Sequence, residues 1–152
     1  MKKNNNNFGR NFNQFKVGDK ISHWPRKTLT ESEHSLFCMI TMNHHPVHID
    51  KLFAESSKFK KRLVVGTYVF SLVVGMTVRE ISGKAIANLN YENIKHHQPV
   101  FLGDTISAFS IILKKNTSKS NSLNGKIKIY TFAKNQKNKI VLSFTRNILI
   151  KK

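Results

Sequence analysis

A short stretch of the sequence gathers side chains that can move protons, orient water or bind a metal ion. Its polar members, which fall between positions 43 and 50, are Asn43, His44, His45, His48 and Asp50. A neutral imidazole can take a proton from water near neutral pH, and a carboxamide can both accept and donate a hydrogen bond. The stretch therefore indicates a site for acid–base or metal chemistry.

Metal binding is the weaker of these two hypotheses. His44 and His48 have i, i+4 spacing, but Pro46 lies between them and prevents a regular helix that would place both on one face. The single cysteine, Cys38, excludes a cysteine-rich metal site and an internal disulfide. Asp50 is better explained as the N-cap of a following helix. We therefore expect no bound metal.

Two short helices are predicted on either side of this stretch. Thr30 followed by Glu33 forms a capping box, in which each side chain satisfies a free backbone N–H of the other residue. A helix should therefore begin there and end near Thr41. Asp50 should begin a second helix that extends to about Ser57. The polar residues between the two helices would then lie in a proline-containing loop.

The most apolar segment of the chain predicts a longer, buried helix over residues 67–80. Ser71 and Gly75 would let this helix lie close to a neighbouring element, and Gly83 would end it as the C′ residue. Gly66 stands just before the helix. Its N–H could stabilise an oxyanion at the helix N-terminus, or its missing side chain could simply allow close packing, and the sequence favours neither.

The second half of the chain changes to the alternating, β-branched pattern of strands. Strands are predicted over residues 85–94, 105–114, 126–134 and 140–150. A hairpin turn is predicted at Asn124-Gly125. Helices followed by an antiparallel meander predict an α+β fold, in which a curled antiparallel β-sheet wraps around the long central helix.

The chain length fits one domain with a tail ahead of it. Residues 1–13 are rich in Asn and Lys and should be disordered or loosely attached, whereas residues 14–152 should form a single domain. Phe8, Phe12 and Phe15 could hold parts of the tail against the domain. The basic N-terminus leads into asparagines rather than an apolar segment, so we expect no secretion or import signal and a cytoplasmic protein.

The formal net charge of +18 arises from 26 Lys and Arg against 8 Asp and Glu. Such a surplus suits nucleic acid, an anionic membrane surface or a phosphate-bearing ligand. Lys and Asn are over-used throughout, so compositional bias explains the charge better than a nucleic-acid surface, which would interleave aromatic residues with Arg. No apolar run reaches the roughly 18 residues of a membrane span. We therefore expect neither membrane nor nucleic-acid binding.

Four motifs, taken together, resemble one known family. They are Phe15-x-Val17-Gly18-Asp19, Thr30-Glu31-x-Glu33, Pro46-Val47-His48-x-Asp50 and Pro99-Val100-x-x-Gly103-Asp104-Thr105. The chain resembles the MaoC-like dehydratases, which have the hotdog fold and include the R-specific enoyl-CoA hydratases. It is most similar to the branch of mesaconyl-CoA hydratase and β-methylmalyl-CoA dehydratase. That placement depends on Thr41-Met42-Asn43-x-His45-Pro46-x-His48-x-Asp50, Val73-Val74-Gly75-Met76-x-Val78 and Ala87-Asn88-Leu89.

The resemblance implies a reaction and an assembly. The reaction is that of a hydro-lyase, which hydrates a 2-enoyl-CoA or dehydrates a 3-hydroxyacyl-CoA, and a mesaconyl-CoA-like substrate is among the candidates. Coenzyme A would be part of the substrate, with no other cofactor. The assembly would be a homodimer or a set of dimers.

The resemblance also implies roles for individual residues. The family's hydratase motif reads Gly-Asp-x-Asn-Pro-hydrophobic-His, and these positions are held here by Met42, Asn43, His45 and His48. His48 would be the base, and Gly66 would be the oxyanion donor. Asn43 can orient the water but cannot take its proton, so the second proton-transferring group stays open between His44, His45 and a water. The amide at position 43 also supports an alternative: a catalytically weak or non-catalytic acyl-thioester-binding hotdog protein.

Residues that would bind the substrate follow from the charge of coenzyme A. Its phosphates would attract the basic linker before Gly66, so Lys61 and Arg62 are predicted to bind the substrate together with His45. A solvated basic linker without a ligand is the alternative.

Overall fold

The computed structural model describes residues 8–117 and 123–152. Its helices are α1 (Glu31–Ile40), α2 (Pro46–Ile49), α3 (Lys51–Ser56) and α4 (Gly66–Met76), with a 3-10 turn at Phe12–Gln14 and a π-helical turn at Val78–Ser82. Its strands are β1 (Lys20–Ser22), β2 (Lys27–Thr28), β3 (Ala85–His96), β4 (Thr105–Thr117), β5 (Asn124–Lys134) and β6 (Ile140–Lys151). The helices come early and the long strands come late, as an α+β fold requires.

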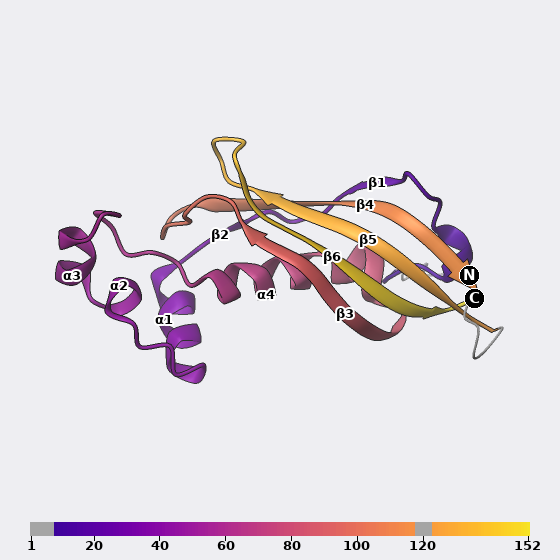
Figure 1. The fold of residues 1–152 in the computed structure, drawn as a ribbon, viewed down its shortest axis with the longest axis horizontal. Helices are drawn as coiled ribbons and strands as arrows, with labels where there is room; N and C mark the ends of the chain where they lie inside the picture. The colour runs from indigo at the N-terminus through magenta and orange to yellow at the C-terminus, as the bar shows by residue number, and fades with distance from the viewer. Residues whose placement is uncertain (1–7, 118–122) are drawn as a thin grey trace, which may run out of the picture.

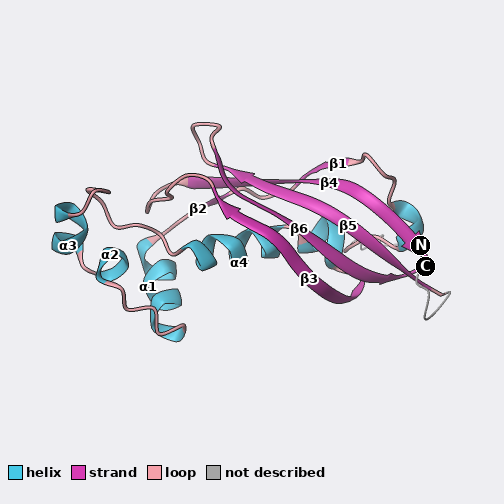
Figure 2. Cartoon of the chain, in the orientation of Figure 1, coloured by secondary structure: helices cyan, strands magenta, loops and turns pink. Residues whose placement is uncertain are grey.

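The strands form one curled antiparallel sheet. Their spatial order is β1–β4–β5–β6–β3, and β2 also pairs with β4. Strands β4, β5 and β6 make the predicted meander, while β3 lies at the far edge beside β6. Figure 1 shows α4 running along the inner face of the sheet, with α1, α2 and α3 beyond one end. Figure 2 shows the same arrangement, with α4 alongside the strands, so the predicted curled sheet around a central helix is confirmed.

A hydrophobic core lies between α4 and the sheet. Val69 and Val73 on one side of α4 are buried with Leu142 and Phe144 of β6. Alternate residues of β4 and β5 are buried, as expected when one face of an antiparallel sheet is covered, and Ile106, Ala108 and Ala133 among them belong to this core. The N-terminal end of α4, at Gly66, lies toward the end of the sheet where the short helices gather (Figure 1).

The central helix differs from its prediction at both ends. It begins at Gly66 itself rather than after it, and it ends at Met76, with the π-helical turn following at Val78–Ser82. Ser71 and Gly75 are exposed, and a Cβ added at Gly75 would meet no atom within 4 Å. The prediction that these small residues pack against a neighbouring element of the chain is therefore wrong.

Two glycines that were predicted at turns instead make room for aromatic rings of the tail. Gly83 has φ −59°, so it is not a left-handed C′ residue, and a Cβ there would lie 2.7 Å from the ring of Phe8. The pair Asn124-Gly125 begins β5 rather than forming a hairpin turn. A Cβ at Gly125 would collide with the ring of Phe12, so glycine is needed for packing at that position.

The predicted loose tail is partly docked on the sheet. Residues 1–7 of this tail lie outside the described residues. Phe12 and Phe15 are buried in a second core cluster with Ile127 and Ile148, so the prediction that they hold the tail is confirmed. The ammonium group of Lys115 lies 4.4 Å from the centre of the Phe12 ring, a cation–π contact that adds to this attachment.

Candidate active site

The turn that ends α1 fixes the backbone of Asn43. Met42 N–H donates to the carbonyl of Met39 at 3.3 Å, and Asn43 N–H donates to that of Cys38 at 3.0 Å, which is the Schellman pattern. Met42 has φ +56°, a left-handed conformation that costs a residue with a side chain about 1–2 kcal/mol. The turn therefore explains why a glycine suits this position. The carboxamide of Asn43 is half-buried and makes no hydrogen bond to a described residue.

A short helix, α2, positions His48 where a loop was predicted. Pro46 stands at its first position, and the Nδ1 of His45 accepts a hydrogen bond from Val47 N–H at 3.2 Å. His48 Nδ1 lies 2.7 Å from the carbonyl oxygen of Leu63, which can only accept. The proton of the neutral ring therefore sits on Nδ1, and Nε2 keeps a lone pair that can take a proton from water.

His34 is a site residue to which sequence reasoning gave no role. Its side chain is buried, and its Nε2 accepts a hydrogen bond from Val65 N–H at 3.0 Å. Its ring centre lies 6.0 Å from that of His48. Burial, followed by the nearby His48 and Arg62, lowers the pKa of His34, which keeps the ring neutral and able to accept. The available signal was a histidine on the apolar side of its helix, four residues before Cys38.

Gly66 is the first residue of α4 and lies next to the side chain of His96. Within the described part of the chain, the N–H of Gly66 has no hydrogen-bond acceptor, as is usual in a first helical turn. A Cβ at this position would lie 2.9 Å from Cε1 and 3.1 Å from Nε2 of His96, which ends β3. The missing side chain therefore lets the edge of the His96 ring approach the helix N-terminus. Burial, and then the neighbouring His97, lower the pKa of His96.

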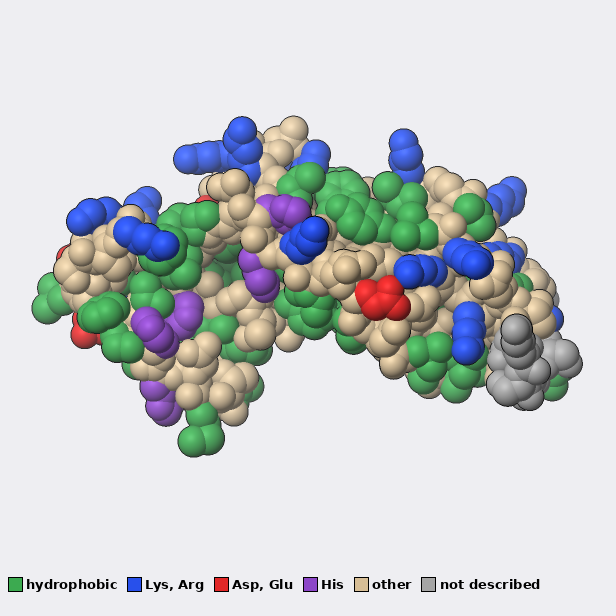
Figure 3. All heavy atoms as spheres, viewed as in Figure 1, with side chains coloured by type: hydrophobic (Ala, Val, Ile, Leu, Met, Phe, Trp, Pro, Cys, Tyr) green, Lys and Arg blue, Asp and Glu red, His purple; other side chains and the backbone are tan. Residues whose placement is uncertain are grey.

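The segment 63–66 joins these groups into one site. Leu63 holds His48, Val65 is held by His34, and Gly66 touches His96, although the three histidines come from α2, α1 and β3. Figure 3 shows histidine side chains in two groups on this face, one over α1 and α2 and one where β3 ends. The structure thus brings together His48 and Gly66, and it makes no hydrogen bond between Asn43 and His48.

The three predicted substrate-binding residues have different surroundings. His45 caps α2 through its ring nitrogen. Arg62 pairs with Glu31 at 2.5 Å and is largely buried, so its charge is already engaged. Lys61 lies 5.9 Å from the centre of the Phe101 ring. Lys61 and Arg62 both line a cavity of about 210 Å³ with Lys51 and Lys60. Lys61 also lines a larger cavity with further basic residues.

The larger of the two cavities has a volume of about 410 Å³ and lies beside the loops that follow α3, β3 and β5. Its charged and amide side chains are Lys61, Gln98, Asp104, Asn135, Gln136, Lys137 and Lys139. Three ammonium groups around one opening suit an anionic ligand better than a neutral one.

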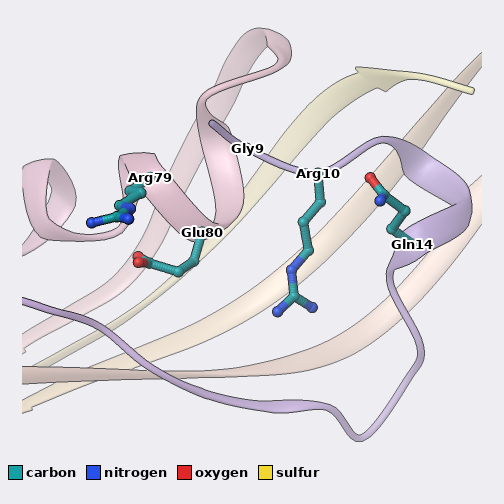
Figure 4. Close-up of a pocket in the computed structure, with 5 residues that line it drawn as sticks. All are labelled: Gly9, Arg10, Gln14, Arg79 and Glu80. Carbon is teal, nitrogen blue, oxygen red and sulfur yellow. The ribbon is translucent and has the colours of Figure 1, made fainter. Parts of the chain in front are cut away.

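Another cavity, of about 350 Å³, lies at the opposite end of α4. Figure 4 shows that its two arginines, Arg10 and Arg79, point in different directions. Arg10 lies 3.8 Å from Asp19, and Arg79 lies over the ring of Trp24. The two guanidinium groups therefore do not converge on a common ligand.

The described residues form neither a metal-binding cluster nor a membrane-spanning helix. No group of three or more His, Cys, Asp or Glu side chains within residues 8–117 and 123–152 could hold a metal ion. In the same part of the chain, no helix combines the length and the apolar character that crossing a membrane requires.

We expect the protein to lose stability as the pH falls below about 6.5. Burial lowers the pKa of His23 and of His34 from 6.5. Below pH 6.5 the unfolded chain therefore binds more protons than the folded chain, so the free energy of unfolding falls as the solution becomes more acidic. Urea denaturation between about pH 8 and about pH 5 measures this dependence. The dependence of stability on pH should be weaker in His34→Gln and unchanged in His44→Gln. A wild-type denaturation midpoint that stays constant with pH would contradict the expectation.

The curled antiparallel sheet around α4 defines a hotdog-fold protein, and the histidines lie near the N-terminal end of this helix. The putative MaoC domain protein dehydratase from Chloroflexus aurantiacus has a TM-score of 0.91 and 29% identity, over 96% of this chain and 41% of that one. The monoamine oxidase regulatory protein from Archaeoglobus fulgidus has a TM-score of 0.83 and 28% identity, over 95% of both chains. The predicted hotdog fold is therefore confirmed.

The MaoC like domain profile matches residues 12–131, so the chain belongs to the MaoC-like family. Mesaconyl-CoA hydratase from Cereibacter sphaeroides is 33% identical over 148 residues, which cover 96% of this chain and 42% of that protein. Beta-methylmalyl-CoA dehydratase from Chloroflexus aurantiacus is 29% identical over 146 residues, which cover 96% and 41%. The chain thus spans about two fifths of the length of these curated relatives, and the predicted family and branch are confirmed.

Proposed function

We propose that the protein is a hydro-lyase that adds water reversibly across the double bond of a 2-enoyl-CoA. One observation carries the proposal: His48 is hydrogen-bonded to Leu63 on the same short segment that presents the N–H of Gly66. Hydration of an enoyl thioester needs a base for the water and a donor for the thioester oxygen. Relatives named as hydratases and dehydratases support this reaction class.

In the proposed reaction, a single residue, His48, both takes the proton from water and returns it to the substrate. His48 Nε2 takes a proton from a water that the Asn43 carboxamide orients, and the water oxygen bonds to C3 of the substrate. The π electrons of the double bond move onto C2 and the thioester oxygen, where Gly66 N–H stabilises the enolate. The proton on His48 then passes to C2, which restores the thioester and the neutral imidazole. No cofactor takes part other than the coenzyme A of the substrate.

We place the phosphates of coenzyme A in the basic cavity beside segment 63–66. Lys61 comes from the linker before α4, while Lys137 and Lys139 come from the loop between β5 and β6. Arg62 contributes less, because Glu31 already neutralises it. The names of the relatives make a mesaconyl-like branched dicarboxylyl thioester the first acyl group to test.

We also propose that two copies associate through β3. This strand lies at the edge of the sheet and carries three exposed apolar side chains, Ile86, Leu89 and Ile94. An exposed edge with apolar side chains is a template for pairing with another strand. Pairing of two copies would place the His96 end of β3 in a more enclosed environment.

An activity panel tests the proposed reaction. The purified protein is mixed with crotonyl-CoA, mesaconyl-CoA and longer 2-enoyl-CoA thioesters, and loss of the conjugated thioester absorbance is followed. We expect turnover of at least one substrate at about 1 s⁻¹ or faster. Failure with the whole panel by a folded protein would contradict the proposal.

The second candidate is a protein that binds acyl thioesters without transforming them. Asn43 favours it, because an amide cannot replace the carboxylate that the family motif places at this position. Such a protein would bind crotonyl-CoA unchanged, and an added carboxylate at position 43 would be expected to create activity.

A further inference from the structure

We propose that His96 is a further catalytic residue, whose ring N–H donates a hydrogen bond to the thioester oxygen beside the N–H of Gly66. The inference rests on the proposed hydration and adds a second donor to the same site. It starts from a contact that joins residues 30 positions apart in the sequence, at the end of β3 and the start of α4.

The contact places the polar edge of the ring at the helix N-terminus. The atoms nearest to a Cβ built on Gly66 are Cε1, Nε2 and Nδ1 of His96, at 2.9, 3.1 and 3.3 Å. These three atoms form the edge that carries both nitrogens, so the ring presents its hydrogen-bonding side and not its apolar side. At the first residue of a helix, the Cα–Cβ direction and the backbone N–H both point toward the N-terminal end. A ligand oxygen that accepts from Gly66 N–H therefore lies beside this edge.

The His96 ring is available for a ligand, whereas the next ring is not. Within the described residues, His96 makes no side-chain hydrogen bond. His97 Nε2 is hydrogen-bonded to Ser143 Oγ at 2.8 Å, and its backbone N–H donates to Val141. The adjacent histidines thus have different tasks: His97 attaches the end of β3 to β6, and His96 faces the start of α4.

The electrostatic surroundings favour a neutral imidazole that donates. Burial and the neighbouring His97 lower the pKa of His96, and the positive end of the α4 dipole acts in the same direction. A neutral ring carries one N–H, which can point at the thioester oxygen as negative charge develops there. The His96 ring takes no proton from the substrate in this role. Two donors on the enolate oxygen would partly offset the weak acid–base assistance from Asn43.

Three variants test the inference. His96→Phe keeps a ring of similar size without a donor, His96→Gln replaces the ring with a donating amide, and His97→Gln is the matched control. We expect His96→Phe to lower kcat for crotonyl-CoA about 10²-fold with little change in KM, which is the size of effect seen when one oxyanion donor is removed. His96→Gln should recover part of this loss, and His97→Gln should stay close to the wild type.

A second measurement reports the contact without turnover. Butyryl-CoA that is isotope-labelled at its thioester carbonyl cannot be hydrated, and the infrared stretch of its carbonyl falls when donors bind the oxygen. We expect a lowered stretch in the wild type and in His97→Gln, and a smaller lowering in His96→Phe. Thermal unfolding of each variant confirms that the fold is intact.

The two measurements separate failure of the inference from failure of the proposed function. If the wild type hydrates no enoyl-CoA but lowers the butyryl-CoA stretch through His96, the hydration proposal fails and the His96 contact stands. A folded His96→Phe with wild-type kcat and a wild-type carbonyl stretch would overturn the inference. An unshifted carbonyl in the bound wild-type complex would overturn it as well.

Discussion

A His48→Gln variant is expected to lose at least about 10³-fold of the rate of crotonyl-CoA hydration while keeping its fold. Glutamine can still donate a hydrogen bond to the carbonyl of Leu63, as Nδ1 of His48 does at 2.7 Å. It cannot take a proton from water at neutral pH. Since no carboxylate stands at position 43, removal of the imidazole leaves the proposed site without a base. Initial rates and the thermal midpoint measure the two parts of the expectation.

The matched control for this variant is His44→Gln. His44 is exposed and lies between α1 and α2, and its ring makes no hydrogen bond to a described residue. The same change of side chain there should leave the rate within about two-fold of the wild type, as expected for a surface position. Equal rates for His48→Gln and the wild type would remove His48 from the mechanism.

An Asn43→Asp variant is expected to hydrate the same substrate about 10²-fold faster than the wild type at neutral pH. A carboxylate can take the proton that a carboxamide can only orient. The substitution breaks no side-chain hydrogen bond to a described residue, and the backbone N–H still donates to Cys38. The new charge lies at the C-terminal end of α1, where the helix dipole opposes it by about 0.5 kcal/mol. Values of kcat and KM measured for both proteins test the gain.

His44→Asp provides the control for charge alone. It adds the same carboxylate one residue away, at an exposed position, and should give no increase in kcat. An unchanged or slower Asn43→Asp would mean that the amide is the functional group at this position. Activity in Asn43→Asp combined with an inactive wild type would instead support the thioester-binding alternative.

Local features of the site could be predicted because they depend on residues close in sequence. Thr30 caps α1 by accepting from Glu33 N–H, and Asp50 caps α3 by accepting from Phe53 N–H. Both helix starts therefore lie where short-range side-chain rules place them. The family motifs predicted the hotdog fold, and alternation predicted the positions of the four long strands.

Helix α2 lies where a loop was predicted on account of Pro46. Proline disrupts a helix interior because it lacks an N–H and clashes with the preceding turn, but neither problem arises at the first position. Pro46 occupies that position, and His45 supplies the cap. The loop prediction was wrong for this reason, and the resulting helical turn aims His48 at Leu63.

The contacts that complete the site join residues that are distant in sequence. His34 reaches Val65, and His96 reaches Gly66, through the packing of α1 and β3 around segment 63–66. No periodicity or spacing encodes such pairs, so both histidines had no assigned role in the sequence. The only available signs were the polar His34 on an apolar helix face and the adjacent pair His96 and His97.

The hydrogen bond between His34 and Val65 gives segment 63–66 its own sensitivity to acid. Only an unprotonated Nε2 can accept from the Val65 N–H, at a distance of 3.0 Å. In a protonated His34 ring, the Nε2–H would face the N–H of Val65, so two donors would meet with no acceptor between them. Acid would then release segment 63–66, which carries the partner of His48 and the N–H of Gly66, while β4, β5 and β6 stay paired. Inactivation by mild acid would therefore be a local and reversible opening, distinct from the cooperative unfolding of the sheet.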